Sequence, residues 1–177
     1  DIRLSGNQQQ TASSVAKATI ENSAYKISLN EQGDITSLYD KINAKELVKS
    51  GRQIRLALFT DNPSYNWPAW EIMKKTVDST PVSITEDVRM ALSEDGELRK
   101  TICVEKRHGK SLFRQYIRLY EGELAGRIDF YNEIDWQSTN ALLKAEFPLN
   151  LDNEKATYDL GIGSVQRGNN VLTAYEV

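Results

Sequence analysis

The sequence predicts an all-β protein, an antiparallel β-sandwich, and three observations carry this prediction. Apolar and polar residues alternate with a period of two, as in Tyr25, Ile27 and Leu29 with their polar neighbours. Such runs recur roughly every 10 to 14 residues between Gly-, Asn- and Asp-containing turns, which is typical of sandwiches and barrels. No segment shows a long helical period.

Each expected strand is a run whose apolar side chains occupy alternate positions and whose end carries a turn signal. The expected strands are 25–30, 35–40, 54–58, 82–85, 101–107, 111–120, 127–136, 142–151 and 156–160. The short Gly-containing segment HGKS predicts that 101–107 and 111–120 pair as a hairpin. The segment KINAKELVKS, residues 41–50, is compatible with one short turn of helix.

Composition excludes several classes of site. The chain has 177 residues, a net charge of -3, one cysteine and one histidine. A single cysteine excludes an internal disulfide and a cysteine-rich zinc site, and a single histidine excludes a histidine-rich metal site within this chain. The interspersed charges argue against nucleic-acid and membrane partners, and no apolar run of about 18 residues predicts a transmembrane helix.

The two ends of the chain differ in character. Residues 1–17 are polar and are interpreted as a linker, whereas residues 18–177 are expected to form the sandwich domain. The last residues, NNVLTAYEV, stop on an alternating apolar pattern, which predicts a domain truncated at its C-terminus. The compartment in which the protein acts is not indicated.

An acidic pair stands on the expected strand 127–136. Glu133 and Asp135 are two residues apart, so their Cα atoms lie about 6.6 to 6.8 Å apart, within the range of paired carboxylates in glycoside hydrolysis. The alternative is an ordinary solvated strand face, and it is favoured because alternation requires a polar face anyway. Two single residues also have plain interpretations: His108 as an exposed loop histidine and Cys103 as a half-buried small side chain.

Two further stretches carry groups suited to a sugar. In GIGSVQRGNN, glycines permit close approach of a ligand, and Arg167, Asn169 and Asn170 supply hydrogen-bonding groups; the alternative is a loop that joins two strands. In YNWPAWEI, an indole such as Trp67 can stack on a sugar ring, whereas Trp70 is expected in the core.

Several segments together resemble one family. NPSYNWPAWEI, RIDFYNEIDWQSTNALLKAEFPLNL, ATYDLGIGSVQRGNN and the closing AYEV occur in the order found in the C-terminal half of glycoside hydrolase family 38, the α-mannosidases. The resemblance covers roughly residues 18–177. It implies part of a β region like the galactose mutarotase supersandwich.

The resemblance implies a non-catalytic role for this chain. In the family, an aspartate nucleophile and a zinc ion bound by His and Asp residues carry the retaining hydrolysis of α-mannosides, in parts that have no counterpart here. We therefore expect no catalytic residue and no metal ligand in this chain, and zinc bound outside it. The expected partners are the α-mannoside substrate and the missing catalytic and helical domains. A sheet edge that these domains leave exposed could also be covered by dimerisation.

The family's β region borders the active-site cleft, and its loop arginine is matched here by Arg167. Asn169 and Asn170 depart from the "RPTHxNT" form of many relatives, because the Pro-Thr-His piece is absent. The substrate-binding residues expected are Arg167, Asn169, Asn170 and Trp67. Two other hypotheses remain: an independent carbohydrate-binding or adhesion module with Tyr65, Trp67 and Arg167 as its sugar site, and a small glycosidase that uses Glu133 and Asp135.

Overall fold

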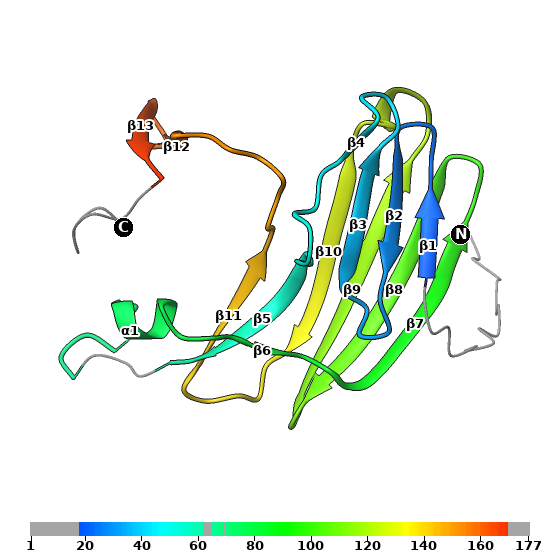
Figure 1. Ribbon diagram of the computed structural model, residues 1–177. Coiled ribbons are helices and arrows are strands. Elements are labelled where there is room, and N and C mark those ends of the chain that lie inside the picture. Colours follow the sequence, from blue (N-terminus) through cyan, green and yellow to red (C-terminus); the bar gives the residue numbers. More distant parts are fainter. Residues whose placement is uncertain (1–17, 62–64, 69, 170–177) are drawn as a thin grey trace, which may run out of the picture.

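The computed structural model describes residues 18–61, 65–68 and 70–169, and these are almost entirely β-structure, as predicted. Two four-stranded antiparallel sheets face each other (Figure 1). The first contains β1 (Ala18–Glu21), β2 (Tyr25–Leu29), β3 (Ile35–Asp40) and β4 (Lys45–Glu46). The second has the order β10-β9-β8-β7 and contains β7 (Glu86–Asp95), β8 (Arg99–His108), β9 (Ser111–Tyr120) and β10 (Ile128–Asp135).

The main core lies between these two sheets, as alternation predicts. Ile27 of β2, Ile117 of β9 and Val104 of β8 are almost fully buried within one apolar cluster. Burying a side chain of this size stabilises the fold by about 1.5–3 kcal/mol. Because each strand turns alternate residues inward, the same strands leave a polar outer face.

A three-stranded sheet continues the first layer. It has the order β11-β5-β6, with β5 at Arg55–Thr60, β6 at Val82–Ser83 and β11 at Ala141–Glu146. Backbone hydrogen bonds in both directions join Ile35 to Ile54, which ties this sheet to β3. A second apolar cluster contains Leu58 and Ile84 from this side and Phe113 from β9, so β9 is covered along its length by both sheets.

The remaining elements are short. The helix α1 (Lys74–Val77) follows β5, the 3₁₀ turn η1 (Gly122–Leu124) joins β9 to β10, and the hairpin of β12 (Lys155–Asp159) and β13 (Ser164–Gly168) lies apart from the sandwich in Figure 1.

The structure confirms the predicted hairpin and corrects the predicted helical turn. β8 pairs with β9 along its whole length, and His108 pairs with Ser111, which leaves a tight turn at 109–110. Residues 41–44 form turns and lead into β4 instead of a helix. The carboxylate of Asp40 accepts the backbone N–H groups of Ile42 and Asn43 at 2.9 and 3.0 Å, and this local bonding competes with helix formation.

A turn between β2 and β3 locks the two layers together. Asn30 holds the turn by accepting the Gln32 and Asp34 N–H groups through its side-chain oxygen. Gly33 has φ of +69°, and its Cα faces Val104 so closely that a Cβ there would overlap it. Beside it, the Lys106 ammonium lies 2.5 Å from the Asp34 carboxylate, with side chains 7% and 2% exposed. Burial lowers the pKa of Lys106, and the Asp34 charge opposes that shift.

Candidate functional site

Arg167 lies on a strand of the β12–β13 hairpin and not, as expected, in a loop. The hairpin register pairs Ala156 with Arg167 and Tyr158 with Val165, so Arg167 and Tyr158 are diagonal neighbours on one face. The guanidinium carbon of Arg167 lies 5.8 Å from the centre of the Tyr158 ring. This cation–π contact, about 0.5–1 kcal/mol at an exposed site, orients the guanidinium along the hairpin surface.

The glycines of GIGSVQRGNN form the turn of this hairpin. Gly161 has φ of +80°, a conformation that residues with a Cβ rarely adopt. Its N–H donates to the Asp159 carboxylate at 2.7 Å, and the Leu160 N–H donates to the Gly163 carbonyl at 2.9 Å. The alternative interpretation of this stretch, a connection between two strands, is therefore the one that the structure shows.

Asn169 closes the base of the hairpin. Its backbone N–H donates to the Glu154 carbonyl at 3.1 Å, and its side-chain amide donates to the Asn153 carbonyl. These bonds engage the backbone N–H and the side-chain NH₂ of Asn169 within the hairpin. The side-chain oxygen of Asn169 is the group that can accept a hydrogen bond from a ligand. Asn170 lies outside the described residues.

The other face of the hairpin is hollow and polar. A pocket of about 540 Å³ is lined by Asp152, Asn153, Glu154, Lys155, Thr157 and Gln166. Thr157 and Gln166 pair across the hairpin, so they face away from Arg167. Amide, hydroxyl and carboxylate groups of this kind can donate to and accept from hydroxyl groups. Sequence reasoning missed these residues because alternation does not tell which face of an isolated hairpin is concave.

The aromatic segment, residues 65–72, is on the surface. Tyr65 is 100% exposed, Trp67 61% and Trp70 89%. The expectation that Trp70 lies in the core is wrong, because the chain turns there: the Trp70 and Glu71 N–H groups both donate to the Trp67 carbonyl, at 3.0 and 3.1 Å. The segment therefore leads into α1 instead of continuing β5 into the core.

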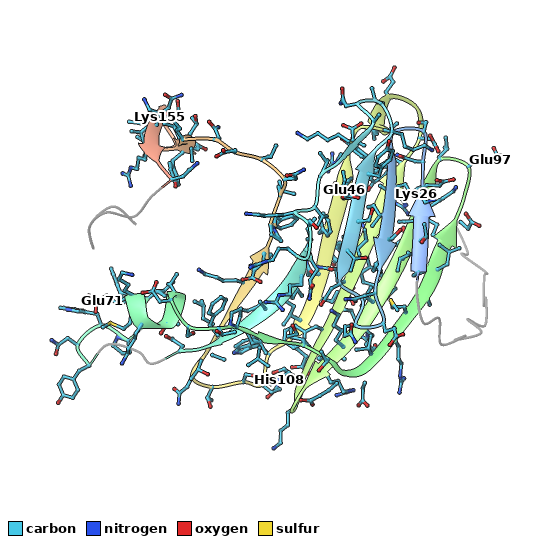
Figure 2. The ribbon with its side chains drawn as sticks, viewed as in Figure 1. Lys26, Glu46, Glu71, Glu97, His108 and Lys155 are labelled. Carbon is cyan, nitrogen blue, oxygen red and sulfur yellow. The ribbon has the colours of Figure 1, made fainter. Side chains whose placement is uncertain are left out.

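The structure does not bring the predicted binding residues together. In Figures 1 and 2, the hairpin, marked by Lys155, and the aromatic segment, marked by Glu71, lie at opposite ends of one side of the molecule. Both are on the side that faces away from the sandwich of β1–β4 and β7–β10. Arg167 and Trp67 consequently belong to two separate surfaces.

Comparison with known proteins identifies the family. Residues 20–177 match the family described as "Glycosyl hydrolases family 38 C-terminal domain". The chain belongs to this family. The resemblance inferred from the sequence motifs is thereby confirmed.

Curated relatives of this family 38 C-terminal domain are much longer proteins. Alpha-mannosidase 2C1 of Homo sapiens is 26% identical over 170 residues, which cover 95% of this chain and 16% of that protein. Alpha-mannosidase G of Dictyostelium discoideum is 26% identical over 167 residues, 89% of this chain and 15% of that protein. The chain thus spans about one sixth of the length of the relatives that it matches.

The acidic pair of this family 38 domain lies on an exposed strand face. The Glu133 carboxylate is 3.5 Å from the Tyr116 hydroxyl, and the Asp135 carboxylate accepts the Gln137 amide at 2.6 Å. Neither carboxyl group lines one of the pockets described for this domain.

The single histidine and the single cysteine both lie on β8. His108 ends β8 beside the turn, with its imidazole 3.6 Å from the Glu86 carboxylate (Figure 2). Cys103 is half-buried, as expected, and burial raises the pKa of its thiol. Neither residue lies on the β12–β13 hairpin or in the aromatic segment.

Within residues 18–61, 65–68 and 70–169, no group of three or more His, Cys, Asp or Glu side chains could hold a metal ion. In the same part of the chain, no helix has the length and hydropathy needed to cross a bilayer.

Proposed function

We propose that this chain is the non-catalytic C-terminal β region of an α-mannosidase, where it buttresses the catalytic part and helps to shape the mannose pocket. The match to the family 38 C-terminal domain over residues 20–177 carries this proposal. The coverage of only about one sixth of each curated α-mannosidase supports a role inside a larger enzyme.

The buttress is assigned to the aromatic segment. Trp67, Trp70 and Ile72 are all more than half exposed and lie within six residues of one another in the sequence. Contiguous exposed apolar side chains of this size mark interaction sites, and aromatic residues dominate the affinity of such interfaces. The fitting occupant is the catalytic part of the same α-mannosidase, because the relatives have most of their length outside the matched region.

The sugar contact is assigned to the β12–β13 hairpin. Arg167 offers guanidinium donors, and Asn169 offers an amide oxygen; both suit sugar hydroxyl groups. Neither group can act as a general acid or base at neutral pH, so the hairpin would bind and orient a mannoside without transferring protons. The family resemblance implies that the zinc of the enzyme would be held outside this chain.

A reconstitution experiment tests the buttress. The catalytic part of the same α-mannosidase is produced separately and mixed with this chain, and hydrolysis of a chromogenic α-mannoside is measured. We expect activity to depend on this chain and to fall at least tenfold for the double variant Trp67→Ser and Trp70→Ser. The matched control replaces Leu98, which is exposed at the β7–β8 turn on another side of the domain, with Ser. Full activity of the catalytic part alone would contradict the proposal.

Calorimetric titration with mannose and α-mannobiose tests the sugar contact. The wild-type chain is compared with Arg167→Ala, and Arg52→Ala, at an exposed position in the loop before β5, is the control. We expect no binding by the chain alone at millimolar sugar and, in the reconstituted enzyme, a raised KM for Arg167→Ala only. Binding by the isolated chain that Arg167→Ala abolishes would support the carbohydrate-binding module instead.

A further inference from the structure

The β10 strand forms the longest uninterrupted free edge among the described strands. All eight of its residues pair with β9 without a register shift, and no described strand pairs with its other side. The opposite edge of the sheet, β7, is broken by two register shifts, and β1, β4 and β6 are short. Broken and short edges are the usual protection against pairing with another chain, and β10 has neither.

The second half of β10 is open on both faces. Tyr131 points to the outer face and is 48% exposed, and Ile134 points to the inner face and is 40% exposed. In the first half, the Phe147 ring packs edge-on against Phe130 at 5.5 Å. The Phe130 carbonyl accepts a long bond, 3.3 Å, from the Asn132 side chain, which the N–H of an incoming strand could replace.

Charge distinguishes the two faces of this edge. The outer face carries Asp129, Glu133 and Asp135, and the inner face carries Phe130 and Ile134. Asp129 is neutralised by Arg127, and the same hydrogen bond lowers the pKa of its carboxyl. Of the ion pairs formed within the described part of the chain, none includes Glu133 or Asp135.

The cation nearest to these carboxylates in the sheet register is already engaged. Arg114 pairs with Glu133 in the β9–β10 register, but its guanidinium bonds to Glu105 at 2.7 Å. A strand added to β10 would therefore meet two carboxylates on the outer face that form no ion pair within the described residues, although the charges of Glu133 and Arg114 attract each other.

This pattern disfavours a second copy of the chain as the partner. Two β10 strands placed edge to edge would set carboxylates beside carboxylates on the outer face, and like charges in cross-strand positions are destabilising. Residues 170–177 of this chain contain no Lys or Arg that could supply the complementary charge. The pattern fits a strand with cationic side chains on one face and apolar side chains on the other.

We propose that the β10 edge accepts such a strand, basic on its outer face and apolar on its inner face, from another part of the α-mannosidase chain. The added strand would extend the second sheet beyond β10 and cover Ile134. Its source in the same enzyme rests on the function proposed above; the edge and the chemistry of its partner rest on β10 alone.

Two designed peptides test this proposal on the 177-residue chain. Both have eight residues with Val and Ile at alternate positions; one has Lys and Arg at the others, and its counterpart has Glu there. N-methyl groups on alternate amides of one edge prevent the peptides from pairing with themselves. Backbone amide NMR shifts of the isotope-labelled chain report where each peptide binds. We expect shifts centred on 131–135 and about tenfold tighter binding of the basic peptide, since each cross-strand ion pair adds a modest gain.

Reversing the charge of the outer face of β10 provides a second test of the proposal. In the double variant Glu133→Lys and Asp135→Lys, the preference should switch to the acidic peptide, because both side chains are exposed and the charge of the outer face is reversed. The control variant, Glu31→Lys and Glu97→Lys, makes the same change of charge at exposed turns and should keep the original preference.

Other outcomes would overturn the proposal. No shift with either peptide would mean that the carboxylates serve only to keep the edge unpaired, and shifts outside β10 or equal binding of both peptides would exclude charge-selective strand addition. If the peptides bind as expected but the reconstitution fails, the proposal for the β10 edge is supported and the proposed function is contradicted. If the reconstitution succeeds but neither peptide binds, the proposed function is supported and the proposal for the β10 edge is wrong.

Discussion

Replacing Gly33 and Gly51 with Ala, one at a time, should separate the cost of a left-handed backbone from the cost of a steric overlap with the core. Gly33 and Gly51 have nearly the same backbone angle, with φ of +69° and +72°. A Cβ at Gly51 meets nothing within 4 Å, whereas a Cβ at Gly33 overlaps Val104 and lies 3.3 Å from the Lys106 side chain. The two positions therefore share the backbone strain and differ in the steric overlap.

The magnitudes follow from this difference. The left-handed conformation costs a residue with a Cβ about 1–2 kcal/mol. Overpacking a well-packed core adds about 1–3 kcal/mol. We expect Gly51→Ala to lower the free energy of unfolding by about 1–2 kcal/mol and Gly33→Ala by about 2–5 kcal/mol.

Urea denaturation followed by tryptophan fluorescence and by far-UV circular dichroism measures both variants. A third variant, Val104→Ala, and its combination with Gly33→Ala complete a double-mutant cycle, and the double variant should cost less than the sum of the single ones. Equal losses at Gly33 and Gly51, or strict additivity in the cycle, would refute the claim that this turn packs against β8.

Two other predictions concern charged groups. Lys106→Met should lower the free energy of unfolding by about 3–5 kcal/mol at neutral pH, because Asp34 is left buried without its cation; a loss below 1 kcal/mol in urea titrations would mean that water reaches the pair. Glu46 is half-buried, which raises the pKa of its carboxyl, but hydrogen bonds from Ser37, Leu38 and Val48 outweigh burial and lower it overall. A lowered pKa means that these bonds stabilise the fold above the ordinary pKa of Glu and that this stability is lost as the pH falls through the folded pKa. Glu46→Gln should therefore destabilise the chain by about 1–2 kcal/mol at pH 7 and flatten the acid limb of its stability curve; an unchanged acid limb would contradict the assignment.

Part of the candidate site was predictable from sequence. The motif around Arg167 and the order of the motif segments along the chain indicated family 38, and the match over residues 20–177 confirms it. The position of Arg167 on β13, beside Tyr158, was not predicted. It depends on the register of the hairpin, and Gly161 and Gly163 allow turns at more than one position in this stretch.

The sequence by itself determined the all-β class, most of the strands and the β8–β9 hairpin, because alternation and turn chemistry are local properties of the chain. Only the tertiary structure decided which apolar side chains are covered. Trp70 is as apolar as a core residue, but the turn at Trp67 carries it away from both layers. Lys106 and Asp34 are 72 positions apart, and their buried contact exists only because the β2–β3 turn packs on β8. Burial and long-range pairing depend on what the opposite layer supplies, and that information is spread over the whole fold.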